Sequence, residues 1–238
     1  MKLDILAFAA HPDDVELAAS GSVLKHVKNG YSVGIVDLTR GELGTRGSAE
    51  IRDAEAKEAA KILGLSARVN LDLGDGFFEN NKENLLRLVE QIRVYQPEIV
   101  WCNAITDRHP DHQRGSELAS RACFLAGLRK IETKWNGENQ NAWRPKSVYH
   151  YIQDHYIKPD FVVNVSDEWS GKMDSIMAYS SQFYNPNSKE PVSPISSKEF
   201  LQVIEGRGRE MGRMISREYG EGFTVERPIG IDDLMKVY

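Results

Sequence analysis

The chain contains little of what several protein classes require. Only two of its 238 residues are cysteine, Cys102 and Cys123, and they do not form a Cys-X-X-Cys pair. This argues against a disulfide-stapled fold and a dithiol redox site, and it predicts two buried thiols. The formal net charge of −5 argues against the basic surface of a nucleic-acid-binding protein.

Long apolar runs are also missing. The apolar stretches have the length of a strand and are too short to cross a bilayer. The amino-terminal stretch carries one lysine and a short apolar run that an aspartate interrupts, which is unlike a secretory signal peptide. We therefore expect a cytoplasmic protein that binds neither a membrane nor nucleic acid.

The residues that are present are typical of a globular α/β protein. Hydrophobic residues make up 41% of the chain and charged residues 27%, and the length suits one domain over residues 1–238. In the first half, strands are predicted at 3–10, 31–39, 68–73 and 99–103. Helices are predicted between them, at 15–27, at 82–95, and in a segment that Ser48 caps and Gly64 ends.

This alternation predicts βαβ units in an α/β fold. We expect a three-layer, Rossmann-like architecture with a mostly parallel central sheet and helices on both of its faces. The second half is less regular. Strands are predicted at 147–152 and 161–165, helices at 169–179 and 198–219, and loops at 134–144 and 185–197, the last with three prolines and a possible role as a lid.

Two short motifs carry the candidate chemistry. His-Pro-Asp-Asp at residues 11–14 follows the first predicted strand, and His-Pro-Asp-His at residues 109–112 follows the fourth. Because ligands bind outside the carboxyl ends of the strands in such sheets, both motifs should lie on the same rim. Two adjacent aspartates after an apolar strand are costly to desolvate unless a cation neutralises them. The sequence therefore predicts a metal site at the carboxyl ends of the strands.

Zinc is the metal that this donor set suits best. Two histidines and one aspartate would leave a fourth place for water, which is the arrangement of catalytic zinc. Imidazole and carboxylate ligands without cysteine leave iron, cobalt and manganese open. A single His-Pro-Asp would be explained by a turn, since proline and aspartate favour turns. Two copies at corresponding strand ends favour the metal site.

These motifs resemble the LmbE-like/PIG-L family of zinc-dependent N-acetylglucosaminyl deacetylases. The matching segments are AHPDDVELAASG at residues 10–21, TRGELGTRG at 39–47 and HPDH at 109–112. Within that family the chain is similar to the deacetylases of bacillithiol biosynthesis. That finer resemblance lies in RPKSVYHYIQ at 144–153, PDFVVNVS at 159–166 and GRGREMGRMISREYGEGF at 206–223.

The resemblance implies a role for each matching position. One zinc ion per chain would be held by His11, Asp14 and His112. Asp13 would be the general base, and His109 would stabilise the transition state or protonate the leaving amine. Relatives form trimers or hexamers, which implies a homo-oligomer.

The resemblance also implies contacts with a small amino-sugar substrate. Arg52 would hold a carboxylate of a malate-like group in bidentate fashion, and Asp75 would bind a sugar hydroxyl. Relatives often have Pro-Asp-Gly where this chain has Gly-Asp-Gly at residues 74–76, so the resemblance retains Asp75 but leaves the stiffness of the loop open.

Four further residues have two interpretations each. Glu42 and Arg46, in the glycine-rich loop of residues 40–47, either line the site or are solvated. Tyr184 either reaches over the site as a lid residue or packs within its loop. Asp111 either orients a histidine of its own motif or serves the turn.

The predicted function is removal of the acetyl group from an N-acetylglucosamine conjugate, namely N-acetylglucosaminyl malate in bacillithiol biosynthesis. Free N-acetylglucosamine and chitin-derived oligosaccharides are the alternative substrates. A nucleotide-binding Rossmann-like module is the alternative from another class, but the first strand does not end in Gly-X-Gly-X-X-Gly. The Gly-X-Ser-X-Gly of residues 30–34 opens a strand, unlike the nucleophile elbow of a serine hydrolase.

Overall fold

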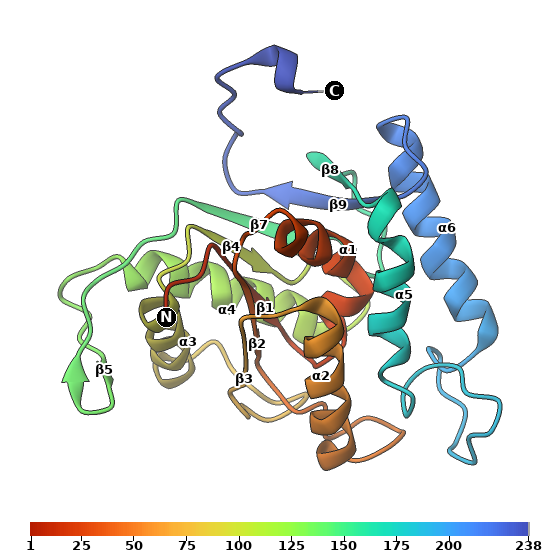
Figure 1. Ribbon diagram of the computed structural model, residues 1–238. Coiled ribbons are helices and arrows are strands. Elements are labelled where there is room, and N and C mark those ends of the chain that lie inside the picture. Colours follow the sequence, from red (N-terminus) through yellow and green to blue (C-terminus); the bar gives the residue numbers. More distant parts are fainter. Residues whose placement is uncertain (238) are drawn as a thin grey trace.

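The main sheet of the computed structural model, which describes residues 1–237, has seven strands (Figure 1). In chain order they are β1 (Ile5–Ala9), β2 (Val33–Asp37), β3 (Ala67–Asn70), β4 (Ile99–Cys102), β7 (Ser147–Tyr151), β8 (Phe161–Asn164) and β9 (Gly220–Val225). Their order in the sheet is β3-β2-β1-β4-β7-β9-β8. All pairs from β3 to β7 are parallel, whereas β9 runs antiparallel to both β7 and β8. The prediction of a mostly parallel sheet is confirmed.

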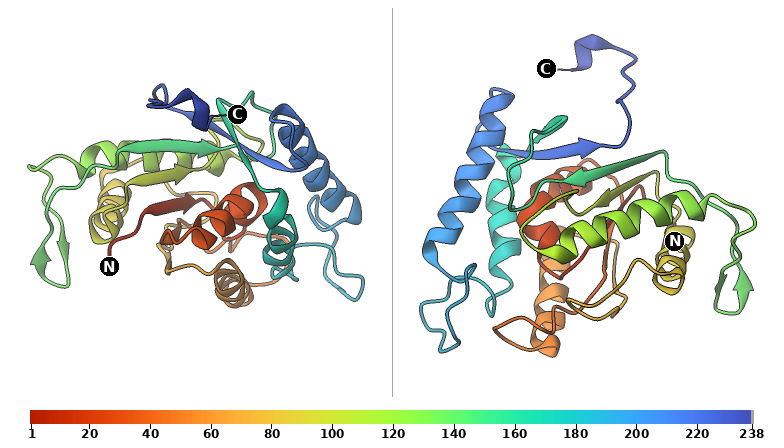
Figure 2. Two further views of the ribbon diagram at one scale, coloured as in Figure 1. Left: turned by 45° about the horizontal axis from the view of Figure 1, so that its top comes forward. Right: turned by 180° about the vertical axis from the view of Figure 1, so that it is seen from behind.

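Helices cover both faces of this sheet. They are α1 (Asp14–Lys28), α2 (Ala49–Leu63), α3 (Lys82–Tyr95), α4 (Pro110–Ala126), α5 (Trp169–Met177) and α6 (Lys198–Met214), with the short 3₁₀ helices η1 (Ser166–Glu168) and η2 (Leu234–Lys236). Figures 1 and 2 show α3 and α4 on one face and α1, α2 and α5 on the other, with α6 beside α5. The three-layer prediction is therefore confirmed.

The alternation of side chains along β1 explains why both faces are apolar. Successive strand residues point to opposite faces of a sheet. Leu6 and Phe8 belong to the core that includes α3 and α4, and Ile5 and Ala7 belong to the core that includes α1. A strand buried on both sides is expected to be a continuous apolar run, as this one is.

Local signals in the sequence place α2 correctly. Ser48 Oγ accepts a hydrogen bond from the backbone N–H of Ile51 at 3.3 Å, which caps the helix. Gly64 ends it with a φ of 65°, a left-handed conformation that costs glycine little. Both predicted ends are confirmed.

The end of the predicted helix at 198–219 is wrong. The helix ends at Met214, Ser216 has a φ of 56°, and residues 220–225 form β9. A Cβ at Gly220 would lie 2.5 Å from Cγ1 of Val162, so the approach of β9 to β8 requires glycine there. Glycine weakens the sequence signal of a strand, and β9 is therefore not recognised as a strand from the sequence.

One segment predicted as a loop contains regular structure, and so does the second motif. Residues 134–144 include an antiparallel pair, β5 (Lys134–Trp135) and β6 (Glu138–Asn139). The second motif is the start of α4, because His109 is its N-cap and Pro110 its first residue. Proline is favourable there, since the first residue of a helix needs no N–H donor. Residues 185–197 form neither helix nor strand, as predicted.

Cys102 and Cys123 are free and buried, which confirms the prediction of two buried thiols. Within residues 1–237, no helix combines the length and the apolar character needed to cross a membrane.

A buried ionic network fixes α1 against the sheet. Arg68, in β3, is bonded to Glu16 of α1 through Nη1 at 2.5 Å and to Asp37 of β2 through Nε at 2.8 Å. Tyr179 OH also donates to Glu16, at 3.0 Å. Removing one partner of this buried network would leave an uncompensated charge. Because Glu16 is one of the partners, the network fixes the position of the first turn of α1 against β2 and β3. That turn carries Asp14, one of the predicted ligands.

Candidate metal centre

The two histidine motifs lie together because the strands that precede them are neighbours. β1 and β4 pair in parallel, so the loops that follow them leave the same edge of the sheet. The ring centroids of His11 and His112 are 5.5 Å apart, and the ring of His109 lies 4.6 Å from His11 and 5.2 Å from His112. Three imidazoles from two distant segments thus form one cluster.

Asp14 lies between His11 and His112. Its Oδ1 is 3.0 Å from Nε2 of His112, and its Oδ2 is 3.7 Å from Nδ1 of His11. Burial raises the pKa of Asp14, but the two imidazoles, His112 foremost, more than offset this and hold that pKa well below its ordinary value. The three predicted ligands are therefore in mutual contact, with the aspartate in its charged form.

His11 also belongs to two other groups of three possible ligands, neither of which includes Asp14. One ligand atom each from His11, His109 and His112 lie within 4.8 Å of one another, and the same holds for His11, Asp75 and Asp111. Nε2 of His11 is 3.0 Å from Oδ1 of Asp75 and 3.5 Å from Oδ2 of Asp111. All of these donors are nitrogen or carboxylate oxygen, which is the chemistry that suits zinc.

Two amides that the sequence analysis missed hold Asp14 in place. Asn103 Nδ2 donates to Oδ2 of Asp14 at 2.9 Å, and Gln153 Nε2 donates to Oδ1 at 3.1 Å. Asn103 follows β4 and Gln153 follows β7, so both come from neighbouring strand ends. The available signals were a polar residue at the end of one predicted strand, Asn103, and one directly after another, Gln153.

Asp107 orients His112 and was also missed. Its Oδ2 is hydrogen-bonded to Nδ1 of His112, while its Oδ1 accepts the backbone N–H groups of Asp154 and His155 at 3.1 and 2.7 Å. This leaves Nε2 of His112 to face Asp14. A carboxylate on the far nitrogen is the usual support for a metal-binding histidine. The signal was an acidic residue five positions before His112.

The carboxylate of Asp13 has no hydrogen-bond donor among residues 1–237, although Asp13 is buried at the edge of the cluster and lines the cavity described below. Burial raises its pKa to about 7, against the opposing effect of the positive charge of Arg52. Its backbone has a φ of 135°, which a residue with a side chain rarely adopts. Such strain, of order 1–3 kcal/mol, gathers at functional sites.

The contacts of His109 favour a neutral imidazole ring that can donate a hydrogen bond through Nε2. Its Nδ1 accepts the backbone N–H of Asp111 at 3.2 Å, so the proton of the neutral ring is on Nε2. Burial, together with the neighbouring His11 and His112, lowers the pKa of His109. The free N–H is therefore available to an acceptor in the cavity.

The side chain of Asp111 has a different partner from the one predicted. Its carboxylate approaches His11 at 3.5 Å, instead of a histidine of its own motif. It also accepts the backbone N–H of Gly76 at 2.7 Å and pairs with Arg114. Asp111 thus ties the start of α4 to the loop that carries Asp75.

A cavity of about 310 Å³ opens beside the cluster. Its lining includes the predicted residues His11, Asp13, Asp14, Arg46, Arg52, Asp75, His109 and His112. Ser193, Pro194 and Ile195 line it as well, so the segment 185–197 does reach the site. Tyr184, directly before that segment, is half-buried and is not among the lining residues.

The two residues of the glycine-rich loop that were predicted either to line the site or to be solvated differ in exposure. Arg46 is 5% exposed and donates through Nη2 to Ser188 at 2.6 Å. Glu42 is exposed and does not line the cavity; its Oε1 accepts the backbone N–H of Asp75 at 2.7 Å. Arg52 is 6% exposed and is bonded to Gln182, which also donates to the backbone oxygen of Arg46.

Residues 6–123 match the family model described as PIG-L, GlcNAc-PI de-N-acetylase. A conserved protein from Thermus thermophilus has a solved structure that is similar over 96% of this chain and 97% of its own, with 34% identity and a TM-score of 0.85.

Two of the relatives are enzymes whose names describe different reactions. The 4-oxalmesaconate hydratase of Pseudomonas putida is 28% identical over 74% of this chain and 73% of its own. The diacetylchitobiose deacetylase of Thermococcus kodakarensis is 29% identical over 75% of this chain and 70% of its own.

Asp107→Asn should weaken zinc binding by about 10- to 100-fold, because the substitution removes the carboxylate that fixes the ring and tautomer of His112. Competition with a chromophoric chelator measures this affinity. Asp167→Asn, which changes an exposed acid in η1, is the matched control and should bind zinc as the wild type does. Equal affinities for the Asp107 variant and the control would contradict the assigned role.

Proposed function

The chain belongs to the PIG-L family, and from that premise we propose that it is a zinc-dependent deacetylase of an N-acetylglucosamine conjugate. The observation that carries this proposal is the meeting of two strand-end motifs around Asp14, beside a buried Asp13 whose carboxylate has no hydrogen-bond donor among residues 1–237. A metal-dependent hydrolytic site needs a metal position and an unengaged base next to each other.

The proposed ligands are His11, Asp14 and His112, which offer two imidazole nitrogens and one carboxylate. Bound there, zinc would lower the pKa of a water molecule towards about 7 and polarise the amide carbonyl. Asp107, Asn103 and Gln153 keep the ligand side chains in their orientation. A site that is prepared in this way loses little energy in reorganisation during the reaction.

Asp13 is the proposed general base. It accepts the proton of the attacking water, for which a raised pKa near 7 is suitable, because a base is most effective when its pKa is close to the working pH. The positive charge of Arg52 nearby favours the ionised form of Asp13 before the proton arrives. The attack forms a tetrahedral carbon at the acetyl group.

His109 is the proposed hydrogen-bond donor to the oxygen that becomes negative in this step. The backbone N–H of Asp111 occupies Nδ1, so Nε2–H is the group that can donate. Collapse of the tetrahedral carbon releases acetate, and the leaving amine takes up a proton. The proton that Asp13 received is the nearest source.

The substrate that we propose is N-acetylglucosaminyl malate, as in bacillithiol biosynthesis. Arg46 and Arg52 line the cavity, and neither makes an ion pair with any residue that the structure describes. The buried Nε of Arg46 has no hydrogen-bond partner either. Buried guanidinium groups whose hydrogen-bond partners are neutral keep an uncompensated charge, so an anionic group on the substrate would be stabilised here. Asp75 is the proposed contact for a sugar hydroxyl.

Free N-acetylglucosamine and chitin-derived oligosaccharides remain the second candidate substrates. The diacetylchitobiose deacetylase among the relatives favours this possibility. A nucleotide-binding function lacks support, since β1 is followed by a strained aspartate and a cluster of acids where a pyrophosphate would need glycine. A single domain, a cytoplasmic location and a homo-oligomeric state complete the proposal.

Asp13→Asn should retain zinc and lose activity by about 100- to 10,000-fold, because the base is removed and the ligands are left in place. Acetate release from N-acetylglucosaminyl malate measures the activity, and elemental analysis measures the metal. Full activity in this variant would rule out Asp13 as the base, and loss of zinc would show that it acts as a ligand.

Arg46→Gln should lower kcat/KM for N-acetylglucosaminyl malate by about 10- to 100-fold and change that for free N-acetylglucosamine by less than about threefold, because one charge-assisted contact is lost only with the anionic substrate. Lys189→Gln removes an exposed charge from segment 185–197 and serves as the control. An equal loss with both substrates would assign Arg46 a purely structural role.

A further inference from the structure

The guanidinium group of Arg52 has no counter-ion, although acidic residues are close to it in the sequence. Arg52 is buried, lines the catalytic cavity and makes no ion pair with any of residues 1–237. Its neighbour Asp53 pairs instead with Arg40, at 2.6 Å. Glu55 lies three residues further along α2, a spacing at which opposite charges usually pair on a helix. The charge of Arg52 is therefore left without an ion pair although a suitable partner is one helical turn away.

Two serines engage Glu55 in place of Arg52. Oε1 of Glu55 accepts the backbone N–H of Ser181 at 2.7 Å and the hydroxyl of Ser180 at 3.1 Å, and Oε2 accepts the hydroxyl of Ser181 at 2.7 Å. Both serines follow α5, which packs against α2. Figures 1 and 2 show the segment after α5 at the same end of the molecule as the glycine-rich loop. Glu55 thus holds this segment on α2 with both of its oxygens.

The glycine-rich loop covers the guanidinium group with backbone atoms. A Cβ at Gly41 would lie 2.0 Å from Nη1 of Arg52, and a Cβ at Gly44 would lie 2.9 Å from Nη2, so a side chain at either position would displace the group. The one acid of this loop, Glu42, has its Oε1 on the backbone N–H of Asp75. The loop therefore encloses Arg52 without neutralising it.

Gln182 stands where a counter-ion would be expected. It is 4% exposed and lines the cavity, and within residues 1–237 its Oε1 is the one hydrogen-bond acceptor of the Arg52 guanidinium group. Its Nε2 donates to the backbone oxygen of Arg46 and to Oγ of Ser181, both at 2.8 Å. An amide offers an acceptor and a donor, so one side chain fixes both arginine positions. Because the amide is neutral, it leaves their positive charge intact.

We propose that Gln182 is the positioning residue that makes this site select amino-sugar conjugates bearing a carboxylate. Its amide holds the guanidinium group of Arg52 and the backbone of Arg46 at the cavity, and leaves their charge for the substrate. The inference rests on the proposed deacetylase function and adds the residue that sets its specificity. A glutamate of the same shape would form a charge-assisted pair with Arg52 and would lose the donor to the oxygen of Arg46.

The ratio of kcat/KM for N-acetylglucosaminyl malate to that for free N-acetylglucosamine tests this proposal. Gln182→Glu should lower the ratio by about 10- to 100-fold, because the new carboxylate competes with that of the substrate for Arg52. The loss should lie mainly in KM for the malate conjugate, since the hydrogen bonds of Gln182 go to Arg46, Arg52 and Ser181 and not to the metal cluster. Gln182→Met keeps the site neutral but removes the hydrogen bonds, and should lower the ratio by about 3- to 10-fold.

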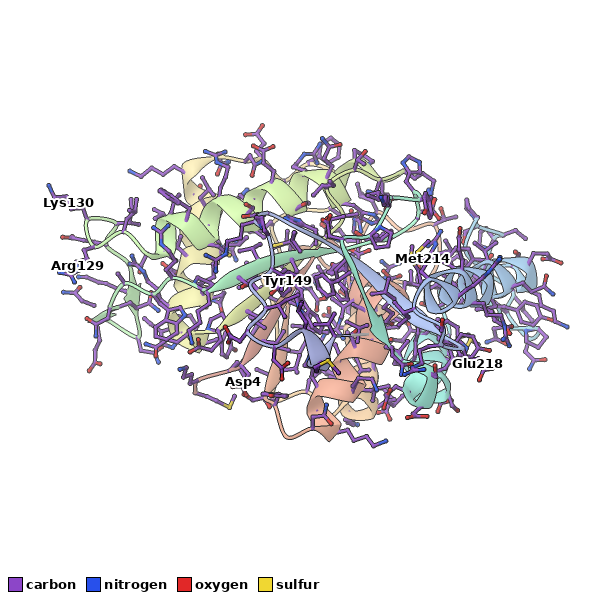
Figure 3. All side chains as sticks on the ribbon, turned by 90° about the horizontal axis from the view of Figure 1, so that it is seen from above. Asp4, Arg129, Lys130, Tyr149, Met214 and Glu218 are labelled. Carbon is purple, nitrogen blue, oxygen red and sulfur yellow. The ribbon has the colours of Figure 1, made fainter. Side chains whose placement is uncertain are left out.

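Gln202→Glu is the matched control. It makes the same change at an exposed position of α6, the helix at the margin of the molecule that ends at Met214 (Figure 3), and should keep the wild-type ratio.

An unchanged ratio in Gln182→Glu overturns the proposal. An equal loss of kcat with both substrates also overturns it, because that result would mean that Gln182 serves the fold, or serves Asp13 through the charge of Arg52. Thermal melting shows whether each variant is folded. If the glutamate variant does not fold, Gln182→Met decides, and a wild-type ratio in that variant overturns the assigned hydrogen bonds.

Binding measured without turnover separates this inference from the proposed reaction. Titration calorimetry with the same two compounds, on Asp13→Asn proteins with and without Gln182→Glu, gives the ratio of their affinities. A fall in this ratio, with no acetate released by the wild type, would contradict the reaction and support the role of Gln182. Acetate release by the wild type, with no change in the ratio, would contradict the role of Gln182 alone.

Discussion

The pairing of β1 with β4 is the constraint on which the site depends. Parallel strands that are neighbours release their following loops at one edge, and here those loops bring three imidazoles and several carboxylates into a small buried volume. Buried carboxylates at such density are stable only when positive charge compensates them. The imidazoles can provide part of that charge, and a divalent cation would provide the rest.

The surrounding residues restrict this cluster to one arrangement. Each carboxylate has a distinct set of partners. The amides of Asn103 and Gln153 bond to Asp14, whereas Asp107 supports His112 from the far side of its ring. Among the aspartates of the cluster, Asp13 alone has a carboxylate that accepts no hydrogen bond from any of residues 1–237. Two adjacent aspartates thus acquire different chemical properties through their contacts, as is common for pairs of catalytic acids.

The sequence predicts the features that are encoded locally. The apolar run of β1, the Ser48 cap and the Gly64 stop each depend on residues within one or two turns of chain, and all three are as expected. Motif spacing, together with the rule for strand ends in parallel sheets, places residues 11–14 and 109–112 on one rim.

The remaining features depend on contacts between distant segments. Gln153 meets Asp14 only because β7 lies beside β4, and the sequence contains no sign of that neighbour. The carboxylate of Asp111 turns to His11 because Gly76 and Arg114 also engage it, which changes the partner that its motif predicts. β9 is hidden because the glycine that its packing requires is also the residue that weakens a strand signal.

The most direct measurement is anomalous diffraction at the zinc edge from a crystal of the zinc-loaded protein. The account predicts one strong peak per chain, about 2.0–2.2 Å from donor atoms of His11, Asp14 and His112, with one coordination place open toward Asp13. A peak held instead by His11, Asp75 and Asp111, or no peak in this cluster, would contradict it.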